Sequence, residues 1–424
     1  MFAIYFLALI VLLILSVPIG VSLGITGMAF LVLEQSMGLE VAIQRIVVAA
    51  DSFSLMALPL FILSGNIMCG GSISRRLVEF MDSLIGWITG GMSMVTTLAS
   101  MFFGAISGSC TATTAAIGSI MIPGMNEKGY AKDYGSAVTA ASGTLGAVIP
   151  PSLMTITYGT ITGVSVGALF MAGFLPGILM GISLMIVSYF ICKKAGYKSD
   201  VKFSFLRVYV SLKKSILAVL MPVIVLGGIY GGIFTPTEAA TIAVVYTLIV
   251  SVFIYKDVAF KDIPRIFIDS ALMSGGIMFL VCTASLFGWT ISVARVPQMI
   301  ASAMLSVTDN PILILMMINV LLLVIGCFLE SIATILIMTP ILFPIILEMG
   351  IDPLQFGIIM CVNICIGTMT PPFGVCLFVS SGISGVPVER IAIKALPYLA
   401  ILIFDLLLIT YIPTISTILP SLFL

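Results

Sequence analysis

Residues 367–374 read GTMTPPFG in the middle of an apolar stretch, and residues 143–152 read GTLGAVIPPS, which is nearly the same phrase. In a membrane an unbroken helix pairs all of its own backbone hydrogen-bonding groups, so a Gly and a Pro pair within an apolar run call for a structural explanation. Gly allows conformations that other residues resist, and Pro lacks the amide that closes a helical hydrogen bond. Each phrase therefore predicts a broken helix, within about 135–160 and about 354–380, whose backbone carbonyls are left free.

The composition is that of a multi-pass membrane protein, because 60% of the 424 residues are hydrophobic and only 8% are charged. The chain has no His, the usual proton shuttle and the commonest metal ligand. The SGSCT phrase at 107–111 offers Ser and Cys but no base beside them, so we expect no enzyme. Eight Cys stand singly in apolar runs and read as buried, inert thiols. A zero net charge without a basic cluster gives no sign of nucleic acid binding.

Apolar runs of about 20 residues predict the crossing helices. Besides the two broken helices, they cover about 50–70, 167–192, 215–234, 236–255, 266–294 and 391–415. Pro18 divides the first 33 residues into two short pieces, which we interpret as a pair of membrane helices rather than a cleaved signal. Two further runs, about 92–123 and 311–346, have polar breaks at 106–110 and 327–331. We interpret these as re-entrant hairpins that return to the face they entered.

The basic residues test this topology through the positive-inside rule. If the connector 193–214 is cytoplasmic, 16 of the 18 Lys and Arg residues fall on the cytoplasmic side, and only Arg45 and Arg295 do not. Making either hairpin a full crossing would move the basic residues after it to the wrong face. The charges therefore favour two hairpins, with both termini outside.

The two Pro-Pro phrases belong to a repeat that spans half the chain. Residues matched at an offset of 221 or 222 include Gly104 with Gly326, Pro123 with Pro344, Pro150 with Pro371, Gly163 with Gly385 and Pro176 with Pro397. The predicted repeats are 1–192, with scaffold helices over about 1–80, and 215–424, with scaffold helices over about 215–300. Each holds an odd number of crossings, so the second copy is inverted. An inverted repeat with broken helices is the architecture of secondary transporters, which bind substrate and ions near the midplane.

The broken helices suit an alkali cation, because backbone carbonyls and Ser or Thr hydroxyls are hard neutral ligands. The alternative is a simple Pro kink repaired by a neighbouring helix. That alternative is weakened because the break occurs twice, each time after a hairpin.

The hairpin tips suit an anionic group such as a carboxylate, because helix N-termini favour negative charge. A run of small residues in a membrane helix also serves as a packing face, which is the competing interpretation of the first tip. The candidate substrate-binding residues are Ser107, Gly108, Ser109 and Thr111 at the first tip and Glu330 and Ser331 at the second. Glu330 has three possible roles: facing the substrate, taking a proton, or sitting at the aqueous end. Asp405 is an intramembrane acid for which the sequence identifies no partner.

Four phrases together resemble the large membrane subunit of tripartite ATP-independent periplasmic (TRAP) transporters: FGAISGSCTATTAAIGSIMIPGM (103–125), GTLGAVIPPSLMTITYG (143–159), GGIFTPTEAATIAVVY (231–246) and GTMTPPFGVCLFVSSGISG (367–385). The likeness covers essentially the whole chain. It implies an elevator-type symporter in a bacterial inner membrane, in which a sodium gradient powers uptake of an organic acid. It also implies two partners, a periplasmic binding protein that delivers the substrate and a small four-helix membrane subunit.

The resemblance further implies two sodium sites related by the internal symmetry, formed mostly by main-chain carbonyls. One site would use Ser107, Gly146, Ile149 and Pro151, and the other Gly326, Gly367, Thr370 and Phe373. The first break separates its GT and PP by five residues and the second by two, so we expect the sites to differ in geometry. Two alternatives stay open at this point: a stand-alone sodium–carboxylate symporter of similar fold, and a passive channel, since polar breaks also line pores.

Overall fold

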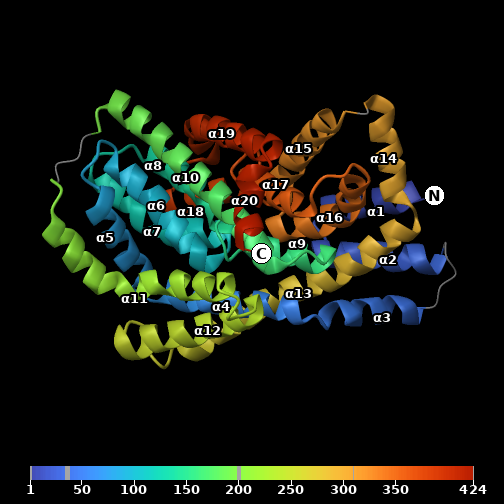
Figure 1. Cartoon of the computed structure of the whole chain (residues 1–424), viewed down its shortest axis with the longest axis horizontal. Coiled ribbons are helices and arrows are strands. Elements are labelled where there is room, and N and C mark those ends of the chain that lie inside the picture. The colour runs from blue at the N-terminus through green and yellow to red at the C-terminus, as the bar shows by residue number, and fades with distance from the viewer. Residues whose placement is uncertain (1, 34–38, 198–201, 309, 424) are drawn as a thin grey trace.

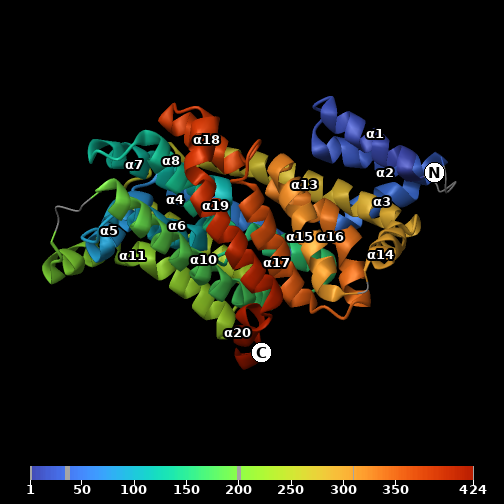
Figure 2. The same ribbon diagram turned by 90° about the horizontal axis from the view of Figure 1, so that it is seen from above.

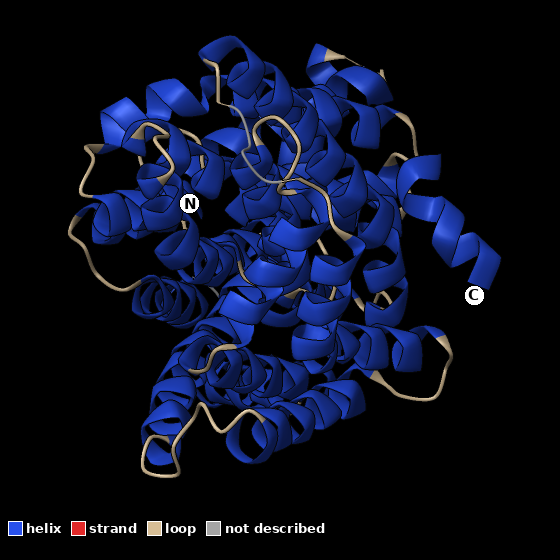
Figure 3. Ribbon diagram, turned by 90° about the vertical axis from the view of Figure 1, so that its left-hand side faces the viewer, coloured by secondary structure: helices blue, strands red, loops and turns tan. Residues whose placement is uncertain are grey.

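The computed structural model describes residues 2–33, 39–197, 202–308 and 310–423. All the secondary structure in these residues is helical, as Figure 3 shows. Eight of the helices are long and apolar enough to cross a membrane. The predicted fold class, an all-helical multi-pass membrane protein, is confirmed.

Among the described residues, the first half of the chain forms ten α-helices. They are α1 (Phe2–Ile14), α2 (Ile19–Leu33), α3 (Leu39–Ala50), α4 (Ala57–Gly70), α5 (Ile73–Ile85), α6 (Gly91–Ser107), α7 (Cys110–Glu127), α8 (Lys132–Gly143), α9 (Leu153–Thr162) and α10 (Val166–Ala195). Short 3₁₀ turns precede α4 and follow α8 (Phe53–Met56 and Thr144–Ala147).

The second half, over residues 202–308 and 310–423, forms another ten. They are α11 (Phe205–Tyr230), α12 (Pro236–Leu248), α13 (Ile263–Val293), α14 (Val296–Val307), α15 (Pro311–Phe328), α16 (Ser331–Glu348), α17 (Pro353–Gly367), α18 (Val375–Ser384), α19 (Val388–Tyr411) and α20 (Thr414–Phe423). A π-helical turn (Ile249–Ile254) extends α12.

Helix boundaries recur between the halves because the same residue types stand there. Gly163 ends α9 with φ at 76°, and its counterpart Gly385 ends α18 with φ at 71°; both angles lie in the left-handed region that Gly adopts readily. Each hairpin turns within two residues, between α6 and α7 and between α15 and α16.

The two halves pack reciprocally. In the scaffold, α2 packs on α13 and α12 packs on α4; in the hairpin layer, α7 packs on α18 and α16 packs on α9. Exchange of equivalent contacts in this way is what a two-fold relation between the halves produces. Figure 1 shows α3, α4, α12 and α13 along the lower side of the molecule and the hairpins with α17–α19 above them. Figure 2, the view from above, shows α17 and α19 across the middle of the molecule.

Several boundaries differ from the sequence prediction. The short helices α3, α14 and α20 were not predicted as separate elements. Helix α10 runs to Ala195 and helix α11 begins at Phe205, so more than half of the predicted connector 193–214 is helical; residues 198–201 lie outside the described residues. The prediction that all cysteines are buried is wrong for Cys69, which is exposed.

The basic segments gather at one end of the molecule, which we call the basic end. Arg207 pairs with Asp82, and Arg390 lies 3.9 Å from Asp133. Arg76 donates to the backbone carbonyl of Lys214 at 3.4 Å. Under the positive-inside rule this end faces the cytoplasm.

Candidate functional site

The two hairpin tips meet in the interior and enclose a small cavity, which we call the tip cavity. Gly108, Ser109 and Thr111 line it from the first tip and Glu330 and Ser331 from the second. The structure thus brings together five of the six predicted substrate-binding residues. The space open to the centre of a water molecule is about 20 Å³, enough for a water or two. A bound carboxylate would therefore require the tips to separate.

The sixth predicted residue, Ser107, lies behind the tip cavity. It is buried, with 5% of its surface exposed, and its hydroxyl is 2.9 Å from that of Thr113. On its other side it meets the scaffold, because a Cβ at Gly65 in α4 would lie 3.5 Å from the Ser107 Cα. Ser107 therefore lies where the hairpin touches the scaffold.

The first broken helix packs closely on the first tip. The carbonyl of Gly108 accepts a hydrogen bond of 3.2 Å from the Leu153 amide. A Cβ at Gly108 would lie 2.8 Å from the Pro151 carbonyl oxygen, and one at Gly104 would lie 2.7 Å from the Gly146 Cα. Two of the predicted cation ligands, Gly146 and Pro151, are thereby held against the hairpin that carries the third, Ser107. The fourth, Ile149, is 6% exposed and donates its amide to the Leu145 carbonyl at 3.0 Å.

The second broken helix repeats this approach. A Cβ at Gly367 would lie 2.6 Å from the carbonyl carbon of Gly326, so the hairpin and the break again touch backbone to backbone. Thr370 donates its hydroxyl to the Ile366 carbonyl at 2.8 Å, which leaves the hydroxyl oxygen able to accept or coordinate. Phe373 is exposed, and its ring centroid lies 5.5 Å from that of Phe328 near the second tip. The Pro–Pro peptide bond is cis in both breaks.

The two tips differ in charge at their helix N-termini. The Glu330 carboxylate accepts from the amides of Ile332 and Ala333, at 2.9 and 3.2 Å, and so caps α16 with a negative charge. The corresponding cap of α7 is the neutral hydroxyl of Ser109, which accepts from the Ala112 amide at 3.4 Å. Because α16 already holds its own anion, the N-terminus of α7 is the more favourable place for a substrate anion.

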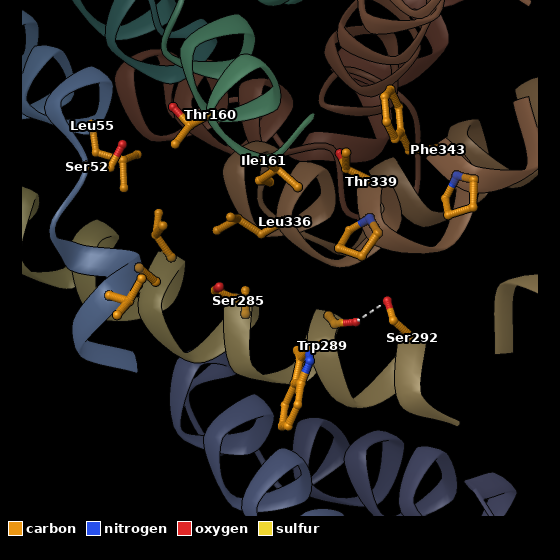
Figure 4. Close-up of a pocket in the computed structure, with 17 residues that line it drawn as sticks. Ser52, Leu55, Thr160, Ile161, Ser285, Trp289, Ser292, Leu336, Thr339 and Phe343 are labelled. Atoms are coloured by element: carbon orange, nitrogen blue, oxygen red, sulfur yellow. Dashed lines mark hydrogen bonds between the residues drawn. The ribbon is translucent and has the colours of Figure 1, made fainter. Parts of the chain in front are cut away.

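Two larger cavities lie between hairpins and scaffold, in positions related by the repeat. The α13–α16 cavity, of about 410 Å³, is lined by residues including Ser285 and Trp289 of α13 and Thr339 and Phe343 of α16 (Figure 4). The α4–α7 cavity, of about 690 Å³, is lined by residues including Asn66 and Cys69 of α4, Arg75 of α5, and Ala112, Ala115 and Ser119 of α7.

The hairpins do not sit equivalently on the scaffold. At the α13–α16 cavity the helices are packed together, since a Cβ at Gly288 would lie 2.9 Å from the Pro340 side chain. The equivalent helices of the first half, α4 and α7, make far fewer contacts with each other than α13 and α16 do. The repeat offsets relate Gly288 and Pro340 to Asn66 and Ser119, which line the larger α4–α7 cavity, with Ser119 exposed. The space between hairpin and scaffold is therefore wider beside the basic end than on the opposite side.

A solved structure shares this architecture. The Alcanivorax borkumensis YdaH transporter matches with a TM-score of 0.66 over 89% of each chain, at 15% sequence identity. The fold is that of a multi-pass membrane transporter. The chain belongs to the tripartite ATP-independent periplasmic transporter family, DctM component, whose family model matches residues 6–415. The sequence resemblance is thereby confirmed, and the chain is a multi-pass protein of the bacterial inner membrane.

Curated relatives are similar over most of this chain. The isethionate TRAP transporter permease protein DctMQ of Oleidesulfovibrio alaskensis is 44% identical over 404 residues, which cover 95% of this chain but 64% of that longer protein. The C4-dicarboxylate TRAP transporter large permease protein DctM of Pseudomonas aeruginosa is 40% identical over 94% of both chains. The sialic acid TRAP transporter large permease protein SiaM of Vibrio cholerae is 38% identical, covering 96% of this chain and 95% of that one.

Proposed function

We propose that this chain is the large permease of a sodium-coupled symporter that takes up an organic acid delivered by a periplasmic binding protein. The relatives' names refer to C4-dicarboxylate, sialic acid and isethionate, which are all organic anions. The tip cavity suits such a group, because it combines hydroxyls with the neutral-capped N-terminus of α7.

Sodium coupling is supported by the two close approaches of hairpin and broken helix. Gly104 meets Gly146, and Gly326 meets Gly367, with no side chain between the backbones. This geometry crowds main-chain oxygens from two segments beside Ser107 in one half and Thr370 in the other. It is the single observation that carries the proposal, because such oxygen sets suit Na⁺ and require no carboxylate.

The mechanism we propose is an elevator. The hairpins and broken helices move as one transport domain against the scaffold of α2, α4, α12 and α13. Sodium orders the broken helices and so completes the substrate site; the first of them is joined to the first tip by the hydrogen bond from Leu153 to Gly108. The loaded domain then slides toward the cytoplasm. The cavity open at the basic end fits the inward-facing state of this cycle.

Two partners complete the proposed system. One is the small four-helix membrane subunit, and the longer DctMQ relative leaves room in its chain for such a part. The other is the periplasmic binding protein that supplies the substrate.

The test is uptake into proteoliposomes that contain this chain with its small subunit, assayed with and without the binding protein. We expect accumulation against a gradient that needs both inward sodium and the binding protein. A pore would only equilibrate the anion, and a stand-alone symporter would accumulate it without the binding protein. Accumulation that is unchanged when potassium replaces sodium would overturn the coupling.

A further inference from the structure

Arg75 is a charged residue of the α4–α7 cavity that the mechanism above does not use. Its side chain is exposed in the cavity wall and forms no ion pair with any residue in the described ranges. The adjacent Arg76 is held differently: its guanidinium stacks on Tyr255 at 4.1 Å from the ring centroid, and its Nε donates to the Ser72 hydroxyl at 2.9 Å. Of these two neighbouring cations, Arg75 is the one available to a ligand.

The cavity's acidic residue, Asp257, is already bound by the protein. Its carboxylate accepts from the Ser72 amide at 2.8 Å and from the Ser72 hydroxyl. Ser72 immediately precedes α5, so this carboxylate lies at the helix N-terminus, where the dipole offsets negative charge. The other carboxylate oxygen of Asp257 is buried and has no hydrogen-bond partner among the described residues. The wall of the cavity therefore holds a half-buried carboxylate fixed to Ser72 and one exposed cation, Arg75.

The α4–α7 cavity runs from the first hairpin tip toward the basic end along a face of α7 that carries small side chains. Ala112, Ala115, Ala116 and Ser119 line it at the spacing of a single helix face. Thr111, which lines the tip cavity, is adjacent to the first of them. An anion released from the first tip would find small side chains along this face and one free cation beside it.

We propose that the α4–α7 cavity is the release route of the transported anion and that Arg75 binds the anion's acidic group there. This inference rests on the proposed function. An exposed cation at the mouth of a low-dielectric cleft attracts anions, and the planar guanidinium binds a carboxylate or sulfonate through paired hydrogen bonds. A phospholipid headgroup offers related anionic chemistry at the same position.

Cys69 allows the occupancy of the cavity to be measured directly. It lines the α4–α7 cavity and is exposed, whereas the other seven cysteines are buried. The experiment measures alkylation of Cys69 by a membrane-impermeant maleimide added to the face of the basic end. The chain is reconstituted with its small subunit in phosphatidylcholine vesicles, and succinate, isethionate or sialic acid is titrated at constant ionic strength.

We expect at least one of the three anions to slow Cys69 alkylation. Arg75→Gln should raise the anion concentration that halves the alkylation rate about tenfold, because it removes a charge-assisted hydrogen bond. Arg75→Lys keeps the positive charge, so it should raise that concentration less. Lys261→Gln is the matched control, because it removes one exposed positive charge outside the cavity lining. Equal protection in Arg75→Gln and Lys261→Gln, or no protection by any of the three anions, would overturn the proposal.

A second series of vesicles containing phosphatidylglycerol identifies the source of the anion. If Arg75-dependent protection appears only there and without added anion, the ligand is lipid and the release route is refuted. Uptake separates this inference from the proposed function. Arg75-dependent protection without concentrative uptake would leave the cavity site standing and refute coupled transport.

Discussion

Ser183 of α10 donates a hydrogen bond of 2.9 Å to the carboxylate of Asp405 in α19, and the two residues are 222 positions apart, one more than the offset of 221 that relates Pro176 to Pro397 in the same helices. Positions of two copies that are equivalent to within one residue touch close to the axis that relates the copies. The two-fold axis that relates the halves therefore passes near this bond, between α10 and α19. The other carboxylate oxygen of Asp405 is buried and has no hydrogen-bond partner among the described residues.

This bond predicts a non-additive pair of substitutions. Ser183→Ala should lower the free energy of unfolding by about 1–3 kcal/mol, because it leaves a buried carboxylate without its donor. The double variant Ser183→Ala/Asp405→Leu should recover most of that loss, since no polar group is then stranded. Thermal unfolding in detergent measures both. If the two effects simply add, the bond does not carry the energy assigned to it.

The contacts between hairpins and broken helices predict a strict requirement for Gly. Gly104→Ala or Gly367→Ala would place a methyl within 2.7 Å of opposing backbone. We expect a loss of about 1–3 kcal/mol of stability, typical of overpacking, together with loss of sodium-dependent uptake. Gly382→Ala is the control, because a Cβ there meets no atom within 4 Å. Normal sodium dependence in both test variants would contradict the proposed cation sites.

The side chains at those sites give a second test. Ser107→Leu and Thr370→Leu should weaken sodium-dependent uptake while the protein still assembles, since each replaces a hydroxyl beside the break with a bulky apolar group. Thr417→Leu is the control: its hydroxyl makes the same bond to the carbonyl four residues earlier as Thr370 does, but in α20, away from the site. Sodium titrations of uptake should show higher half-saturation for the two test variants and an unchanged value for the control.

The charged cap of the second tip predicts two separable effects, one on anion binding and one on stability. Glu330→Gln keeps an acceptor for the α16 amides but removes the negative charge, so the tip cavity should bind an anion more tightly. Glu330→Ala removes the cap as well and should lower stability by about 1 kcal/mol. Binding of succinate, isethionate and sialic acid by calorimetry, with Glu348→Gln as a distant control on the same helix, checks the first effect. Weaker anion binding in Glu330→Gln would mean that the carboxylate serves the substrate directly.

The unequal seating of the hairpins predicts the contacts of the opposite state. In the first half, Gly65 of the scaffold meets Ser107 of the hairpin. The equivalent contact in the second half would join Phe287 to Leu329. The scaffold residue next to Phe287 is Gly288, and it meets Pro340 of the hairpin instead. The difference is eleven residues along the hairpin, or about 16 Å at the rise of an α-helix. If each half adopts the hairpin–scaffold contact of the other half in the opposite state, the hairpins move along the scaffold by about that length.

Disulfide trapping can test this movement in a Cys69→Ser background. Gly288→Cys with Pro340→Cys should cross-link in the state described here, and Asn66→Cys with Ser119→Cys should cross-link only in the opposite one. The same cross-linking of both pairs, with and without sodium and substrate, would argue against an elevator.

The sequence predicted the fold class and the residues around the tips because Gly, Pro and hydroxyl residues within an apolar run indicate a small set of structures, chiefly a broken helix or a hairpin turn. It also placed the hairpins and breaks close to where the helices end. The partner of Asp405 was not predicted, although the repeat offset of 221 leads to within one residue of Ser183 and was the signal that could have found it. The cap formed by Glu330 was missed for another reason: the choice among its roles depends on rotamers and burial that one sequence does not carry. Arg75 was placed on the cytoplasmic side, but its cavity depends on the relative position of two domains.

The exchange of scaffold partners between the halves also affects biogenesis. Helix α4 packs on α12, which begins 179 residues after α4 begins, and α2 packs on α13, which begins 244 residues after α2 begins. Helices α2 and α4 therefore lie in the lipid with incomplete contacts until the second half has been inserted. A nascent chain truncated before α13 should accordingly be degraded by membrane proteases, because α2 then has no partner helix to cover its packing face.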